Sequence, residues 1–128
     1  MRELLIMCFV LLIIIFGSIY ICNYLKKTSE EIIFELEELR KSLYKENVST
    51  IELIKKVDSI KLKWNKIKDG WSNIILHQEI DSIETSLIRL ESKIETENRK
   101  EAVEDLETAI FLLGHIKEKE EVNIKNIF

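Results

Sequence analysis

The chain has 128 residues, of which 46% are hydrophobic and 33% are charged, and its formal net charge is −4 at pH 7. This length allows at most one small domain. The acidic balance argues against a nucleic-acid partner, because a phosphate-binding protein needs a basic face.

The first predicted element is a membrane anchor over residues 1–27. The run from Leu4 to Ile21 contains no charged residue, and at 1.5 Å per residue it spans about 27 Å, close to the hydrocarbon thickness of a bilayer. Tyr24, followed by Lys26 and Lys27, has the composition of an interfacial anchor. We therefore expect the lipid bilayer to be one partner of the chain.

A cleaved secretory signal peptide is the alternative for this segment, since it would share the basic start at Arg2 and the apolar run. However, the apolar run is long, and Ile21, Cys22 and Asn23 stand where small residues of a cleavage site are needed. A retained anchor is therefore favoured. Both cysteines, Cys8 and Cys22, lie in the span, so the rest of the chain has no thiol for a disulfide or a metal.

Two arguments about orientation disagree. The count of lysines and arginines, with Lys26 and Lys27 after the span, favours a cytoplasmic domain. A bacterial N-terminal anchor more commonly leaves its short tail inside, and long domains cross with little regard to charge. We expect a single-pass protein of the cell membrane with its helical domain outside the cytoplasm.

The rest of the chain, residues 28–121, is predicted to be helical. It has no proline, and apolar residues recur at spacings of three and four. The first helix is predicted to start at Thr28, which forms a capping box with Glu31. Its apolar positions are Ile32, Leu36, Leu39 and Leu43.

A second helix is predicted after the polar stretch KENVST, where Ser49 and Glu52 make another capping box. Two tryptophans, Trp64 and Trp71, belong to its apolar row, and we expect them to pack in a core rather than to line a ligand cage. The row consists of Val57, Ile60, Trp64, Ile67, Trp71 and Ile74.

The apolar row changes phase near Gly70, which leaves two possibilities open. Either the chain turns at KDGWSN to give four antiparallel helices, or one long helix runs from about Ile51 to Ile94. The row beyond Gly70 consists of Leu76, Ile80, Ile83, Leu87, Leu90 and Ile94.

The last helix is predicted to follow the turn ETENRKE, with Asn98 and Glu101 as capping residues. Its apolar face contains Val103, Leu106, Ile110 and Leu113, widened by Ala102, Ala109 and Ile116. The predicted fold is all-α: an N-terminal transmembrane helix, an antiparallel up-and-down bundle of three or four helices with coiled-coil-like packing, and a tail over residues 122–128. The expected core includes Trp64, Trp71, Ile80, Leu87, Leu106 and Leu113.

Four features of the sequence together resemble an uncharacterised family, a domain of unknown function found in small single-pass membrane proteins of anaerobic, spore-forming, Gram-positive bacteria. They are the pair Trp64 and Trp71, the run His77, Glu79, Ile80 and Asp81, the group Leu113, His115 and Ile116, and the terminal Asn126, Ile127 and Phe128. The resemblance covers nearly the whole chain. It implies an N-terminal anchor with a helical domain, and it implies no reaction.

One cluster is a candidate metal site. His77 and Asp81 share a helix face, and a hairpin that turns near residues 97 and 98 would place His77 level with Glu118 and His115 level with Asp81. A zinc site needs three or four supported ligands, so structural histidines and exposed ion pairs are the simpler interpretation. We expect no bound metal and no cofactor.

Catalytic motifs are missing from the sequence: it has no Gly-rich phosphate loop and no nucleophile elbow. We therefore expect a membrane-tethered interaction or accessory protein, not an enzyme, that docks on a membrane protein or on a second copy of itself. The alternative is an extracytoplasmic bundle that senses a ligand or a metal. A pocket lined by polar groups would favour the alternative, and a dry core with an exposed apolar stripe would favour docking.

Overall fold

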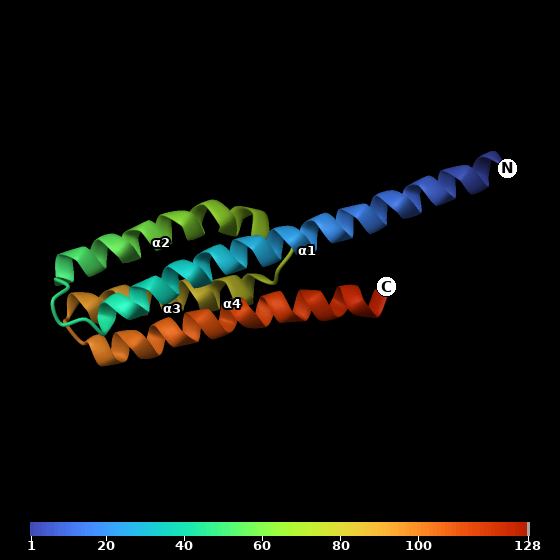
Figure 1. Ribbon diagram of the computed structural model, residues 1–128. Coiled ribbons are helices and arrows are strands. Elements are labelled where there is room, and N and C mark those ends of the chain that lie inside the picture. Colours follow the sequence, from blue (N-terminus) through green and yellow to red (C-terminus); the bar gives the residue numbers. More distant parts are fainter. Residues whose placement is uncertain (128) are drawn as a thin grey trace.

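The computed structural model describes the backbone of residues 1–127 and the side chains of residues 1–119. This part of the chain contains helices and no strand, as predicted. The helices are α1 (Arg2–Leu43), α2 (Thr50–Trp71), α3 (His77–Glu95) and α4 (Arg99–Ile127) (Figure 1). Phe128 and the side chains of the predicted tail, residues 122–128, lie outside the described residues.

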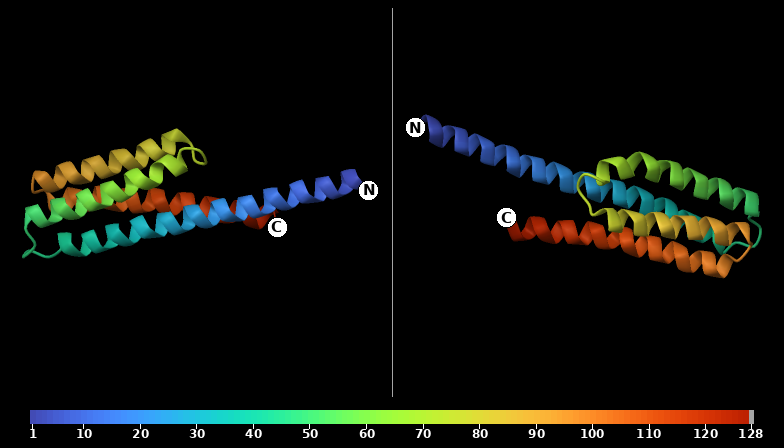
Figure 2. Two further views of the ribbon diagram at one scale, coloured as in Figure 1. Left: turned by 90° about the horizontal axis from the view of Figure 1, so that it is seen from above. Right: turned by 180° about the vertical axis from the view of Figure 1, so that it is seen from behind.

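The four helices form a bundle in which consecutive helices run in opposite directions (Figure 2). Each helix packs on its neighbours in the sequence, and α1 packs on α4, which closes the bundle. The chain therefore turns after Gly70, and the long helix from Ile51 to Ile94 does not form, because α2 ends at Trp71 and α3 begins at His77.

The core of the bundle consists of the apolar rows of the four helices. Spacings of three and four residues place each row on one side of its helix, and the bundle buries these sides against one another. Trp64 and Trp71 are the largest fully buried side chains. The six residues expected in the core, Trp64, Trp71, Ile80, Leu87, Leu106 and Leu113, are all at most 6% exposed.

Helix α1 is continuous through the position where the sequence predicted a new helix, so the capping box of Thr28 and Glu31 is wrong. A capping threonine accepts a bond from a backbone N–H, but the Thr28 hydroxyl donates to the carbonyl oxygen of Tyr24, 2.7 Å away. This bond to the preceding turn is common for threonine inside a helix. Leu25 is already fully buried, three residues before the predicted start.

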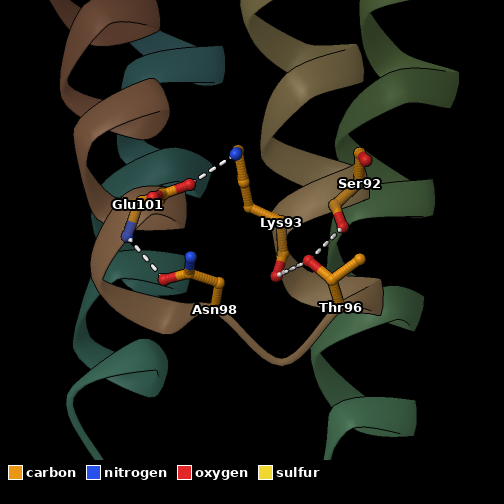
Figure 3. Close-up of polar contacts among 5 residues, drawn as sticks. All are labelled: Ser92, Lys93, Thr96, Asn98 and Glu101. Atoms are coloured by element: carbon orange, nitrogen blue, oxygen red, sulfur yellow. Dashed lines mark hydrogen bonds and ion pairs between the residues drawn. The ribbon is translucent and has the colours of Figure 1, made fainter.

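The other two predicted helix starts are confirmed. The backbone N–H of Glu52 donates to the Ser49 hydroxyl over 3.3 Å, and that of Glu101 donates to the Asn98 side-chain oxygen over 3.3 Å (Figure 3). Each bond satisfies one of the N–H groups that a helix start leaves without a partner.

The α3–α4 turn is held by local polar bonds (Figure 3). The N–H of Asn98 donates to the Lys93 carbonyl over 2.8 Å, and that of Glu97 donates to the Ile94 carbonyl over 3.0 Å. This pattern is a Schellman motif, which places its C′ residue in the left-handed region. That residue is Glu97, with φ of 58°, in a conformation that glycine adopts more readily.

Leu76, predicted as the first residue of the α3 core row, is 65% exposed. The prediction was wrong because α3 begins only at His77 and Leu76 is its N-cap residue, so the periodicity of the helix does not extend to it. Ile75, which precedes it in the turn, is buried instead.

Candidate functional site: the junction between the projecting helix and the bundle

The N-terminal half of α1 extends well beyond the other helices (Figures 1 and 2). We call residues 2–21 the projecting segment. Most of its large apolar side chains, among them Leu4, Phe9 and Phe16, are more than half exposed. Within the described residues, α1 is the one helix long and apolar enough to cross a membrane, judged by length and composition.

The junction end of the bundle is the end from which this segment projects. A buried hydrogen-bond chain connects α2 to α1 there: the Trp71 indole N–H donates to the Thr28 hydroxyl over 2.9 Å, and that hydroxyl donates to the Tyr24 carbonyl. Trp71 is fully buried, so the bond satisfies a polar group that would otherwise be costly to bury.

Trp64 packs on Trp71 in an edge-to-face arrangement, with ring centroids 5.4 Å apart and an interplanar angle of 79°. Aromatic pairs favour this geometry. The two indoles differ in their hydrogen bonding, because the buried Trp64 N–H has no partner among the described residues.

Gly70 explains how Tyr24 fits at the junction. Gly70 lies inside α2, near its end, and a Cβ atom added there would lie 2.6 Å from the Tyr24 hydroxyl oxygen. The glycine therefore allows close packing of Tyr24 and does not end the helix. Tyr24, expected to be an interfacial anchor, is half-buried against the bundle, whereas Lys26 and Lys27 are exposed.

α4 also holds α1 at this level. The Ser29 hydroxyl donates to the Leu113 carbonyl over 2.9 Å in a buried bond. The Lys117 ammonium lies 2.8 Å from the Glu30 carboxylate, and its hydrogen bond lowers the pKa of Glu30. Neighbouring helices thus hold α1 from Leu25 onward, and no linker separates the projecting segment from the bundle.

The predicted α3–α4 register agrees with two ion pairs. The Lys119 ammonium lies 3.5 Å from the Glu79 carboxylate, and Lys93 pairs with Glu101 at the other end of the hairpin. Pairing between residues 79 and 119 is close to the level predicted for His77 and Glu118.

Even so, the candidate metal residues do not form a binding site. His77, Asp81, His115 and Glu118 are all exposed, and His115 stacks on Phe111 with ring centroids 6.2 Å apart. Within the described residues, no group of three or more His, Cys, Asp and Glu residues could hold a metal ion.

Two acidic residues near His77, Glu79 and Glu84, have lysine partners. Glu79 pairs with Lys119, and the Glu84 carboxylate lies 2.6 Å from the Lys68 ammonium. The hydrogen bond that Lys68 donates to Glu84 is the main cause of the raised pKa of Lys68. These carboxylates therefore connect helices at the bundle surface.

A shallow groove between α2 and α3 has a volume of about 160 Å³. It is lined by Lys61, Trp64, Asn65, Glu84, Leu87 and Ile88. The Trp64 N–H does not open into it, since that atom is inaccessible to solvent. The groove therefore offers no buried polar group that would orient a ligand.

Sequence reasoning missed the contacts that build the junction. The Trp71–Thr28 bond and the close approach of Tyr24 to Gly70 both join residues more than forty positions apart. The available signal was the change of phase near Gly70: a second helix that runs antiparallel to the first and turns at KDGWSN ends near the level of Thr28.

The family described as domain of unknown function (DUF4363) matches residues 19–127. The chain belongs to this family. The DUF4363 region begins in the projecting segment and includes the junction and all four helices of the bundle. Comparisons with curated proteins and with solved structures gave no match. The predicted membership of an uncharacterised family is thus supported, while the topology and bacterial origin that the resemblance implied stay predictions.

Proposed function

We propose that this DUF4363 protein is a single-pass, membrane-tethered accessory protein without catalytic activity. It holds a rigid four-helix bundle at a fixed distance from the bilayer and presents it to a membrane protein or to a second copy. The observation that carries the proposal is the division of α1. Its first half is apolar and exposed, whereas its second half contributes Leu25, Ile32, Leu36 and Leu39 to the core.

The apolar exposure of the projecting segment supports an anchor. Leucine, isoleucine and phenylalanine side chains cover it on all sides, which is costly in water and favourable in lipid. A helix in the core of a soluble protein would bury one face, but no part of the apolar window is buried.

The bundle supports an interaction role more than a chemical one. Among the described residues its buried polar side chains are Thr28, Ser29, Ser42 and Ser86. Each of these hydroxyls donates to a backbone carbonyl oxygen within or between helices. The Ser42 hydroxyl also accepts a hydrogen bond from the Lys56 side chain, which joins α1 to α2. The exposed histidines give no support to the alternative of a ligand- or metal-sensing bundle.

Membrane fractionation tests the anchor. We expect the full chain to remain in the membrane pellet after an alkaline carbonate wash, with its N-terminus intact, because the apolar run lacks a cleavage site. A variant with Ile13→Lys and Phe16→Lys should move to the supernatant, because each charge in the span costs about 2.5–3.5 kcal/mol. A mature form beginning near residue 23 would refute the anchor.

Orientation is tested by protease added to intact spheroplasts. We propose that the bundle lies outside the cytoplasm, so the protease should digest α2 to α4 and leave a short protected fragment. The matched sample is permeabilised with detergent to show that a cytoplasmic control protein is cleavable. A bundle that is digested only after permeabilisation would place it in the cytoplasm.

A further inference from the structure

The continuity of α1 fixes where the bundle sits when the projecting segment spans a bilayer. Leu25, the first fully buried core residue, follows Ile21 by four positions, which is about 6 Å along a helix. The headgroup layer on each side of a bilayer is roughly 5–8 Å thick. The junction end of the bundle must therefore lie within that layer or directly on it.

The α2–α3 turn lies at the junction end of the bundle, near the point where α1 leaves it, and the backbone of α4 extends past this level (Figure 1). Trp71 lies level with Thr28, to which it is hydrogen-bonded. The chain continues in the same direction through Ser72 to Leu76 before α3 runs back. The turn thus lies within about one helical turn of Tyr24.

Leu76 occupies this turn with its side chain 65% exposed, while its neighbour Ile75 is buried. The other large apolar side chains exposed on the bundle lie elsewhere. Phe34, Leu62, Ile88 and Phe111 lie one on each helix, and Tyr44 and Ile51 lie at the opposite end. Among the residues whose side chains the structure describes, Leu76 is therefore the large exposed aliphatic residue that the bundle places at its junction end outside α1.

We propose that the α2–α3 turn is a second membrane contact, with Leu76 inserted between the headgroups of phospholipids on the side where the bundle emerges. Transfer of an exposed leucine to an apolar environment is favourable, and because the anchor already holds the turn beside the bilayer, this second contact forms at a high effective concentration. The contact fixes the tilt of the bundle on the bilayer. The inference rests on the proposed anchor.

Depth-dependent fluorescence quenching tests this contact on the full chain. Cys8 and Cys22 are replaced by serine, and one cysteine is introduced at a time by Leu76→Cys, Ile13→Cys or Ile51→Cys. Each is labelled with the environment-sensitive dye NBD and reconstituted in phosphatidylcholine vesicles that carry nitroxide quenchers in the headgroup or at mid-chain. The side chains of Leu76 and Ile51 are 65% and 68% exposed, so the two labelled sites on the bundle have the same solvent exposure before lipid is added.

We expect headgroup nitroxides to reduce the emission of the label at residue 76 about twofold or more, with a blue shift, as for a side chain at the lipid interface. The label at residue 51, at the opposite end of the bundle, should be unaffected. The label at residue 13 should be quenched most by mid-chain nitroxides. Intrinsic fluorescence of Trp64 and Trp71 checks that each variant keeps its fold.

The controls separate failure of this inference from failure of the anchor. Quenching at residue 13 but none at residue 76 would overturn the second contact and leave the anchor intact. No quenching at either residue would overturn both. Equal quenching at residues 76 and 51 would mean that the bundle lies flat on the lipid. A blue shift at residue 76 that disappears on dilution of the protein in lipid would assign the turn to contact with a second copy. Either result would overturn the proposed contact.

Discussion

The two ends of the bundle are held together in different ways. At the junction end, side chains from different helices contact one another: Trp71 binds Thr28, Tyr24 packs on Gly70 and Ser29 binds the Leu113 carbonyl. At the far end, most of the bonds are local, with capping at Ser49 and Asn98. The junction end therefore depends on tertiary packing, and the far end depends mainly on turn chemistry.

A few far-end contacts cross between helices, and the one made by Arg99 involves two hydrogen bonds. The Arg99 guanidinium, at the start of α4, donates to the carbonyl oxygen of Lys45 over 2.7 Å and to that of Val48. It thereby ties the α1–α2 loop to α4, but both carbonyls are close to solvent and could bind water instead. We infer that removal of a side chain at the junction end lowers the unfolding free energy more than removal of one at the far end.

The largest effect is expected for Trp71→Ala. Removal of this fully buried side chain leaves a cavity beside Trp64 and the Thr28 hydroxyl without its indole donor, which together should cost about 3–5 kcal/mol of unfolding free energy. Urea unfolding of the full chain in detergent micelles, followed by circular dichroism, measures it. Ile51→Ala at the exposed far end is the control and should change stability by less than about 0.5 kcal/mol. Equal losses at both ends would contradict the comparison.

The contact between Tyr24 and Gly70 predicts that Gly70→Ala lowers stability when Tyr24 is present and raises it when Tyr24 is replaced by alanine. Alanine favours a helix over glycine by about 1 kcal/mol, but its Cβ would lie 2.6 Å from the Tyr24 hydroxyl oxygen. We expect Gly70→Ala to destabilise the wild-type protein by about 1 kcal/mol through overpacking.

The same substitution in a Tyr24→Ala background should stabilise the protein by about 1 kcal/mol, because the obstructing hydroxyl is gone. A double-mutant cycle of urea unfolding, followed by tryptophan fluorescence, isolates the coupling between the two positions. Identical effects of Gly70→Ala in both backgrounds would show that the glycine has another role.

The difference between local bonds at the far end and tertiary contacts at the junction end explains which parts of the fold could be predicted from the sequence. Ser49 and Asn98 cap helices whose N–H groups lie three residues away, so the sequence contains the whole interaction. Thr28 and Glu31 have the same spacing, yet Thr28 binds Tyr24 and Trp71. A local motif cannot reveal a partner that the fold brings in from another helix.

The same distinction between local and tertiary contacts decides how much of the candidate metal cluster could be predicted from the sequence. Register along the α3–α4 hairpin follows from loop position and helix rise, and the Glu79–Lys119 pair agrees with it. Burial follows from the rotation of each helix about its axis, which the packing of all four helices sets. His77 and His115 consequently lie close to the predicted level, but both are exposed.

A smaller, favourable effect is expected at the far end for Glu97→Gly. Glu97 has a φ of 58° at the C′ position of α3, where glycine avoids the clash of a Cβ atom. The substitution loses an exposed 3.3 Å bond from the Thr50 hydroxyl, which is worth little in water. We expect a gain of up to about 1 kcal/mol, measured by urea unfolding. Glu95→Gly, inside α3, is the control and should destabilise by a similar amount.

The smallest effect concerns the ion pair that joins α3 to α4 beside this turn (Figure 3). Hydrogen bonding to Lys93 lowers the pKa of Glu101 and, reciprocally, raises the pKa of Lys93. Since the folded-state pKa of Glu101 lies below its unfolded-state pKa, the pair stabilises the fold above about pH 4.3. This contribution is lost as the pH falls through the lowered pKa. Both side chains are well exposed, so salt should screen most of it.

We therefore expect Glu101→Gln to flatten slightly the fall in melting temperature on acidification from about pH 5 to pH 3. The slope should not disappear, because Glu30 and Glu38 also have lowered pKa values through their bonds to Lys117 and Lys41. Lys93→Gln is the matched variant: it removes the same pair, so its acid slope should equal that of Glu101→Gln. Thermal melts at low and high salt provide the measurement. If Glu101→Gln flattened the slope but Lys93→Gln did not, the lowered pKa of Glu101 would derive from the hydrogen bond between its carboxylate and the Asn98 side chain, and the ion pair would contribute nothing to holding the far end together.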